Sequence, residues 1–270
     1  MDTFCLNQYS IYLRSNINHK SIKMKNYYCL ALTFLFVMSA NSQVIRYSVL
    51  DVESENREKF IKGLADKTKI YNSKEGQDKV YTFSILSGKN AYDYARVVVR
   101  NSFGEFGTAS DNSKAGREYY MKNVNPYTKS TGSYFMEAQE EASYTPKNGV
   151  FQNDLNFRRV ILYTFKDSHR DDFWRFRMRM KKAMESLGKN RMGVLRCISG
   201  CTGNKVMVRF HFKDYKQDEY FFNNLSEVRE EYDKIYGEES FTEDIDRMWN
   251  SLESKRTWHE RRVNNMSSPF

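Results

Sequence analysis

The sequence has few residues that interrupt regular structure, with only 3 prolines and 13 glycines among 270 residues. This scarcity excludes collagen-like chains and disordered chains rich in proline and glycine. Long apolar runs are scarce as well. The single one lies near the N-terminus, which excludes polytopic membrane proteins. With 40% hydrophobic and 15% aromatic residues, the chain has enough apolar material for one large or two small globular domains.

Familiar catalytic motifs are also missing. The sequence contains no G-x-G-x-x-G, Walker loop, G-x-S-x-G or H-E-x-x-H motif, so nucleotide use, α/β-hydrolase chemistry and zincin chemistry have no motif support. Paired acids such as Glu140 and Glu141 are adjacent in sequence and point apart, which makes them poor acid/base pairs. The sequence therefore favours a non-catalytic protein, although it does not decide whether the chain is an enzyme.

The N-terminal apolar run belongs to a segment, 24–42, with the pattern of a signal peptide. Lys25 supplies a positive start, residues 27–37 are apolar, and small residues precede an expected cleavage at Gln43. An uncleaved anchor is the weaker alternative, because about a dozen apolar residues is short for a span of about 20. The pattern also predicts that residues 1–23 are a non-native upstream extension.

Cleavage at this site would change the composition of the chain. Removing residues 1–42 deletes four cations and one acid, so it leaves 228 residues and lowers the net charge from +9 to +6. We therefore expect an exported protein, in the periplasm, at the cell surface or outside the cell, with no membrane span after cleavage.

Two cysteines, Cys197 and Cys201, remain after this cleavage. An exported compartment permits disulfides, and Gly200 and Gly203 mark a turn that places both thiols near a hairpin end. A local disulfide is favoured over two free thiols. No metal site is predicted, because C-x3-C is not a usual zinc spacing and no second pair of ligands follows.

The hydrophobic pattern divides the rest of the chain into two similar α+β units, 43–147 and 154–265. In the first unit it predicts strands at 44–52, 80–86, 92–100 and 133–144 and helices at 53–71 and 117–124. In the second unit it predicts strands at 158–165, 193–198, 206–213 and 257–263 and helices at 167–187, 226–236 and 243–252. An offset of about 113 residues superposes VLDVESENREKF (49–60) on LYTFKDSHRDDF (162–173), which indicates two tandem βαββαβ units with antiparallel sheets.

This order of elements, over roughly 44–265, resembles the ferredoxin-like dimeric α/β-barrel superfamily, here in tandem duplicated form. In that superfamily two such units, from two chains or from one duplicated chain, pair their sheets into a barrel. The resemblance rests on element order and duplication. Its members include antibiotic-biosynthesis-type monooxygenases, haem-degrading or haem-binding enzymes and stress-responsive barrel proteins, so the resemblance implies a fold and leaves the function open.

Strand alternation predicts which side chains face away from the helices and could bind a ligand. The candidates are Arg46, Arg159, Tyr92, Arg96, Arg209, His211, Trp258 and His259. Arginine offers a rigid fork of donors and stacks on aromatic rings, so these residues would suit a small anionic ligand. Cross-strand ion pairs or a solvated face are the simpler alternatives.

Two further features have a functional and a simpler interpretation. His211 or His259 could serve a monooxygenase-like or haem-handling enzyme, although a surface or ion-paired histidine is the simpler interpretation and no cofactor is identified. The basic run 171–182 places Arg175 and Arg179 on the solvent side of a helix, and we expect no nucleic-acid partner. The expected partner is a small molecule or a protein, and exposed strand edges would allow a homo-oligomer.

Overall fold

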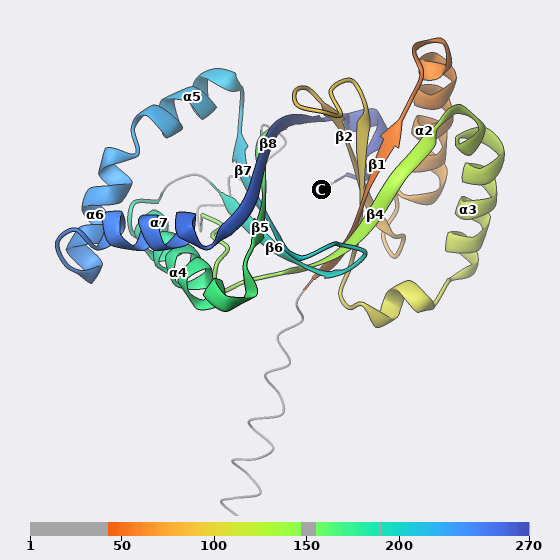
Figure 1. Cartoon of the computed structure of the whole chain (residues 1–270). Helices are drawn as coiled ribbons and strands as arrows, with labels where there is room; N and C mark the ends of the chain where they lie inside the picture. Colours follow the sequence, from red (N-terminus) through yellow and green to blue (C-terminus); the bar gives the residue numbers. More distant parts are fainter. Residues whose placement is uncertain (1–42, 147–154, 189–190, 270) are drawn as a thin grey trace, which may run out of the picture. The chain divides into compact units, whose positions relative to one another are not determined.

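A computed structural model describes residues 43–146, 155–188 and 191–269. The predicted signal peptide and the upstream extension lie outside these residues. The described chain is an α+β protein built around a closed barrel of eight antiparallel strands (Figure 1). The strands are β1 (Val44–Asp51), β2 (Lys79–Ile85), β3 (Tyr94–Arg100), β4 (Lys129–Ala138), β5 (Phe157–Phe165), β6 (Met192–Ser199), β7 (Asn204–Phe212) and β8 (Leu252–Arg262).

Helices connect these strands. They are α2 (Arg57–Tyr71), α3 (Asp111–Asn123), α4 (Arg170–Ser186), α5 (Tyr215–Asn223), α6 (Ser226–Tyr236) and α7 (Ser240–Asn250). Short 3-10 turns are η1 (Ser54–Asn56), η2 (Gly104–Gly107), η3 (Asn125–Tyr127), η4 (Asp167–His169) and η5 (Asn264–Met266). No helix in the described ranges combines the length and the apolar character needed to cross a membrane.

The strand order confirms the duplication. Around the barrel it is β1-β3-β2-β8-β5-β7-β6-β4, so each half has its first strand between its third and its fourth. The barrel closes because β8 pairs with β2 and β4 pairs with β6, which joins each half to the other by the same two strands. One chain therefore completes the barrel, and the eight described strands leave no unpaired edge of the kind that the oligomer hypothesis invoked.

Four elements differ most from the sequence-based expectation. Strand β8 begins at Leu252, before the predicted 257, in a stretch where the predicted helix was still ending. Helix α3 begins at Asp111, before the predicted 117, because the Ser110 hydroxyl caps it by accepting from the Ser113 amide at 3.1 Å. Strand β4 ends at Ala138, since Tyr144 joins the sheet through a single isolated bridge. Helix α5 was not predicted, because two turns of helix offer too few positions for a visible 3.6-residue period.

Apolar side chains from both halves fill the interior of the barrel. Among those that pack there are Ile45, Tyr47, Val49, Phe83, Met136, Val160, Leu162 and Met207. One acid, Glu260, lies among them with no exposed surface and forms an ion pair with Arg158. The Tyr47 hydroxyl and the Trp258 indole each donate to Glu260 Oε1 at 2.6 Å. These bonds join the two halves across the interior, since Tyr47 lies on β1 and the other three residues on β5 and β8.

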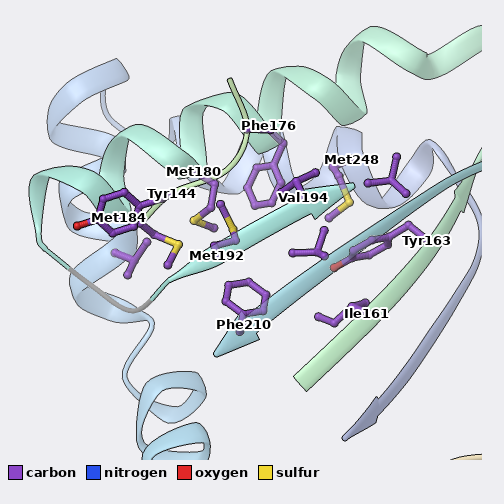
Figure 2. Packing of buried hydrophobic residues seen from close by; sticks show 14 of the residues in the cluster. Tyr144, Ile161, Tyr163, Phe176, Met180, Met184, Met192, Val194, Phe210 and Met248 are labelled. Atoms are coloured by element: carbon purple, nitrogen blue, oxygen red, sulfur yellow. The ribbon is translucent and has the colours of Figure 1, made fainter. Parts of the chain in front are cut away.

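Outside the barrel, each half-sheet is covered by its own helices. In the second half, α4 packs on α6 and α7, and its side chains meet those of β5, β6 and β7 in a large apolar core. Figure 2 shows Phe176, Met180 and Met184 of α4 beside Met192 and Val194 in this core. Burial of so many large apolar side chains is the main stabilising contribution of this half.

In the first half, α2 and α3 pack on each other, and the apolar core beneath them is smaller. Its buried members are Leu50, Val52, Phe60, Leu64, Tyr94, Val124 and Met266. Met266 comes from η5, beyond the predicted end of the second unit at 265. The Ser267 and Ser268 hydroxyls each accept a hydrogen bond at 2.9 Å, from the amides of Thr82 and Val80. The C-terminal segment of the chain therefore completes the core of the first half.

The predicted disulfide between Cys197 and Cys201 is present, with the two Cα atoms 6.4 Å apart. It spans the turn between β6 and β7, where Gly200 and Gly203 have φ angles of 82° and 73°. A Cβ atom on Gly200 would lie 2.5 Å from the Ser133 carbonyl oxygen of β4. The hairpin therefore needs glycine both for its turn and for its close approach to β4.

Candidate functional site

A pocket of about 450 Å³ lies between the outer face of the first half-sheet and the helices α2 and α3. We call it the first-half pocket. Its lining includes Arg46, Ser48, Arg96, Val98 and Arg100 from the strands and Lys67, Tyr71, Gly116, Arg117 and Tyr120 from the helices. Its volume is within the range of about 300 to 1,000 Å³ that is common for small-molecule sites.

Positive charge dominates this pocket. It is lined by five cations, Arg46, Lys67, Arg96, Arg100 and Arg117, and by one carboxylate, Asp78. Asp78 Oδ2 already accepts from Arg100 Nη2 at 3.0 Å and from the Ser113 hydroxyl at 2.8 Å. Within the described ranges the other four cations form no ion pair. Four positive charges therefore have no carboxylate partner.

Arg96 is the most buried of these cations, with 7% of its surface exposed. Its Nη1 donates to the Thr82 hydroxyl at 2.6 Å and to the Met266 carbonyl at 3.2 Å. Its Nη2 is buried and has no hydrogen-bond partner. Burial lowers the pKa of Arg96 to about 10. Buried donors are nearly always satisfied, so this guanidinium nitrogen beside the pocket is suited to donate to an acceptor on a ligand.

The strand register places Arg46 close to Arg96. Arg46 lies opposite Val98 and Ser48 lies opposite Arg96, so the two arginines are diagonal neighbours on one face of β1 and β3. Desolvation, and then the charge of Arg100, lower the pKa of Arg46. Arg46 is exposed, whereas Arg96 is buried, so the two guanidinium groups offer hydrogen-bond donors at different depths of the same pocket.

Lys67 of α2 brings an amine to the same pocket. Its Nζ donates to Asn72 Oδ1 at 2.7 Å. Burial, and next the charge of Arg96, lower its pKa to about 7. An anionic group in the pocket would compensate these charges, and Tyr71, Phe106 and Tyr120 provide aromatic walls for its organic part.

Two of the predicted ligand residues, Arg46 and Arg96, therefore meet in one pocket, but on the face opposite to the one predicted. They lie under the helices, because Tyr47 and Val49 of β1 take the barrel interior. A one-residue change in the assumed parity of a strand exchanges its two faces. The same error applies to Arg159, whose Nη2 lies 2.6 Å from Asp218 of α5. Arg159 also stacks on the ring of Phe222, 3.9 Å from its centroid.

Three other candidates do face the interior of the barrel, as predicted. Trp258 donates to Glu260, and Arg209 and His211 lie on β7 with Arg158 nearby. Burial lowers the pKa of Arg209 to about 9 and that of His211 well below its usual range, and neighbouring arginines add to both shifts. His211 Nε2 is buried without a hydrogen-bond partner.

The last two candidates lie apart from both groups. Tyr92 is 75% exposed in the turn before β3, where its φ angle is 77°. His259 stacks on Phe157 with ring centroids 5.4 Å apart. Its Nε2 lies 3.3 Å from Asp218 Oδ2, and its Nδ1 lies 3.1 Å from the Ser87 hydroxyl. Burial lowers its pKa, and Asp218 opposes that shift.

The histidines do not fit the haem-handling alternative. Both ring nitrogens of His259 already have partners, so neither is available to an iron. At His211, an iron ion would add positive charge beside three arginines, Arg158, Arg191 and Arg209. No histidine lines the first-half pocket. Among the described residues, no cluster of His, Cys, Asp or Glu is arranged to hold a metal ion.

The basic run on α4 is less solvated than expected. Arg175 Nε lies 3.0 Å from Asp244 Oδ1, and Arg179 Nη1 lies 2.7 Å from Asp244 Oδ2. Arg177 is buried and donates to the Tyr163 hydroxyl at 3.2 Å. The predicted solvent-side position holds for Arg175, which has 43% of its side chain exposed, and Arg179 is partly exposed. The helical period of α4 could not reveal that both pair with a buried acid of α7.

The sequence-based prediction missed Lys67, Arg117 and Asp78. A signal for Lys67 was available in the repeat, since the offset of 113 residues that aligns Phe60 with Phe173 aligns Lys67 with Met180. Met180 belongs to the apolar core of the second half. Lys67 is therefore a cation at a repeat position that is apolar and buried in the second half. Such a replacement indicates that the two halves differ at this position.

Comparison with known proteins supports the fold. No family model matches the sequence. No curated protein matches it either. Among solved structures, an anthrone oxidase-like protein superposes with a TM-score of 0.53 at 11% identity, over 83% of this chain and 92% of the other. A monooxygenase-like protein from Lactobacillus acidophilus NCFM gives a TM-score of 0.54 at 14% identity, over 82% of this chain and 94% of the other.

A third similar structure is chlorite dismutase from Candidatus Nitrospira defluvii, in complex with imidazole. It superposes with a TM-score of 0.53 at 7% identity, over 85% of this chain and 95% of the other. At such low identities these likenesses establish the architecture and leave the chemistry open.

Proposed function

The chain has the fold of the dimeric α/β-barrel superfamily, and we propose that it is a ligand-binding protein of this fold that holds a small anionic molecule in the first-half pocket. Binding rather than turnover is the proposed role. The observation that carries this proposal is the buried Nη2 of Arg96, which has no partner and belongs to a guanidinium that lines the pocket.

The charge balance of the pocket supports an anion over a neutral ligand. Arg46, Lys67, Arg96 and Arg117 have no carboxylate partner, so an acidic group would gain charge-assisted hydrogen bonds without breaking an existing ion pair. Carboxylate, sulfate and phosphate oxygens all match the fork of donors on arginine.

Calorimetric titration of the full chain with sulfate tests this proposal. Arg96→Met removes the buried donor while keeping an apolar side chain of similar length. We expect it to weaken sulfate binding about tenfold or more, because a hydrogen bond to a charged group contributes about 1.5 to 3 kcal/mol. Arg46→Met should weaken binding too.

The matched control is Arg159→Met, at the position that the repeat aligns with Arg46. Arg159 is already paired with Asp218, so its loss should leave sulfate affinity unchanged in protein that still melts cooperatively. Equal sulfate affinity in the wild type and in Arg96→Met, or no sulfate binding at all, would contradict the proposal.

We also propose that the protein is exported, on the basis of the signal-peptide pattern in residues 24–42. N-terminal sequencing of the protein from its native host checks this proposal. A mature chain that begins at Gln43 is the expected result, and a chain that retains Met24 would contradict it.

A further inference from the structure

The surroundings of Lys67 set it apart from other lysines of the first half. A Cβ atom on Gly116 of α3 would lie 3.7 Å from Lys67 Nζ and 3.2 Å from Tyr71 Cβ, so a glycine at this position leaves room for the amine between the two helices. The hydrogen bond to Asn72 Oδ1, 2.7 Å long, holds Nζ at the wall of the first-half pocket.

Charged and titratable groups reach this pocket from every element around it. They are Arg46 from β1, Arg96 and Arg100 from β3, Asp78 from the segment before β2, Tyr71 from α2, and Arg117 and Tyr120 from α3. Arg46 and Arg96 oppose a positive charge on Lys67, and Asp78 favours it. Asp78 is shared with Arg100 and Ser113, so it cannot offset both arginines.

These surroundings give Lys67 a pKa of about 7, compared with 10.5 for an ordinary lysine. Near neutral pH, a large share of Lys67 therefore carries an uncharged amine with a free electron pair. Desolvation and a neighbouring cation are the conditions under which a lysine becomes a nucleophile towards carbonyl compounds. Lys62 precedes Lys67 on α2 and differs from it, because Asp66 at 2.9 Å raises the pKa of Lys62.

We propose that Lys67 captures a carbonyl compound covalently, as a Schiff base with an aldehyde or keto group of an anionic ligand whose acidic group is bound by Arg46 and Arg96. This inference rests on the proposed anion-binding function and names the chemical class of the ligand. The pocket would hold such a ligand reversibly, and no turnover is required.

The reaction balances without an oxidant or a reductant. The electron pair of the neutral Nζ forms a bond to the carbonyl carbon, the carbonyl π electrons move to the oxygen, and one Nζ proton passes to that oxygen. The second Nζ proton leaves with the hydroxyl group in the next step. The resulting carbinolamine loses its hydroxyl group as water while the C=N bond forms. One amine and one carbonyl group therefore give one imine and one water.

Pyridoxal 5′-phosphate is a suitable probe, because it carries an aldehyde and a phosphate on one small aromatic ring. The full chain would be incubated with it near pH 7.5, reduced with borohydride to fix any imine, digested and mapped by mass spectrometry. We expect label at Lys67 to exceed label at Lys62 about tenfold or more, because a pKa near 7 leaves most of the Lys67 amine uncharged in the free protein, whereas Asp66 raises the pKa of Lys62.

Two variants separate the nucleophile from the charge. Lys67→Arg keeps a cation in the pocket but has no nucleophilic amine, so it should lose the label while still binding sulfate. Lys62→Met removes an exposed lysine of the same helix and should leave the label at Lys67 unchanged. Equal labelling of Lys67 and Lys62, or label at Lys67 that sulfate does not compete away, would overturn the inference.

A second probe, pyridoxine 5′-phosphate, carries an alcohol in place of the aldehyde and cannot form an imine. Its binding shows whether a failed Schiff base leaves the proposed anion site intact. If it binds and depends on Arg96 while the aldehyde probe leaves Lys67 unlabelled, the anion site stands and the Schiff base is wrong. If neither it nor sulfate binds, both proposals are wrong.

Discussion

The two halves of the barrel have the same topology but use the space between sheet and helices in opposite ways. In the second half, Phe176, Met180 and Met184 of α4 fill that space against the sheet (Figure 2), together with Phe173. In the first half, the apolar core is smaller, and a cationic pocket of about 450 Å³ lies beside it. One copy of a duplicated unit can therefore supply stability while the other accommodates unpaired charge.

The strand register shows this difference residue by residue. In the first half, Ser48 of β1 lies opposite Arg96 of β3 on the face under the helices. In the second half, Ile161 of β5 lies opposite Val208 of β7 at the corresponding place. The first pair is polar and lines the pocket, whereas both members of the second pair belong to the apolar core.

The largest expected effect comes from Phe176, which the offset of 113 residues aligns with Gly63. Phe176 packs on Tyr232 and Phe241, with centroids 6.1 and 5.8 Å away. We expect Phe176→Ala to lower the free energy of unfolding by about 3 to 5 kcal/mol, because it leaves a cavity in the core. Denaturant unfolding followed by circular dichroism measures the change.

The matched substitution in the first half is Gly63→Ala. Its Cβ would collide with the Asn123 carbonyl oxygen, so α2 and α3 must move apart, at a cost of about 1 to 3 kcal/mol. If removing bulk from Phe176 costs less than adding bulk to Gly63, the second half is not the main source of stability.

The next effect exchanges the residues at one repeat position, Met180 and Lys67. Met180→Lys would place an amine in the apolar core, and we expect a loss of about 2 to 4 kcal/mol in unfolding free energy. Lys67→Met removes a cation from a pocket that already has an excess of them, so its cost should stay below about 1 kcal/mol. Similar losses in the two variants would show that the halves do not differ in their tolerance of charge.

The strand and helix order of this chain could be predicted from the sequence, because β1 and β5 are followed by helices whose apolar residues recur with helical spacing. The hairpin of Cys197 and Cys201 could be predicted as well, since glycine turns are local signals. The hydrogen bonds that join the two halves could not be predicted. The one between Tyr47 and Glu260 links residues 213 positions apart and leaves no signal in any local sequence pattern.

For the site, sequence reasoning found Arg46 and Arg96 but placed them on the wrong face. Their residue type suggested ligand binding, yet strand alternation alone does not say which of two faces the helices cover. Lys67 and Asp78 were missed because a lone charge on a helix or in a turn is ordinary. Their meaning depends on α3, which brings Gly116 over the amine of Lys67.

A smaller effect is expected at Arg159, the counterpart of Arg46 in the second half. Arg159 has a carboxylate partner, and removing that partner tests what the pairing contributes. Asp218, almost fully buried, accepts from Arg159 and lies 3.3 Å from His259 Nε2. Asp218→Asn should lower the free energy of unfolding by about 1 to 3 kcal/mol, because it leaves a half-buried guanidinium unpaired. It should also lower the pKa of His259 further, since Asp218 opposes the effect of burial there.

Chemical denaturation and NMR titration of the histidine ring measure these two changes. Asp111→Asn is the matched control, because Asp111 pairs with Lys114 on the exposed surface and its loss should change neither quantity. An unchanged His259 pKa in Asp218→Asn would show that the carboxylate does not neutralise this part of the second half.

The smallest expected effect is the pH dependence of sulfate binding, which should distinguish the first-half pocket from the rest of the molecule. A bound dianion favours the charged form of Lys67 and so raises its pKa from about 7. Well below pH 7 the lysine is already charged in the free protein, so sulfate affinity should be constant there. As the pH rises from 7 to about 9, binding must take up a proton, and the affinity should fall severalfold. The pKa of Arg96 is about 10 and those of His211 and His259 are lowered, so these groups largely keep their charge state in this window. Arg209, with a pKa of about 9, faces the barrel interior and does not line the pocket. Calorimetry of Lys67→Arg should give a flat profile, because guanidinium stays charged throughout. A wild-type profile equally flat would mean that Lys67 keeps its proton in the free protein, and that the cations of the pocket do not act on it as their positions indicate.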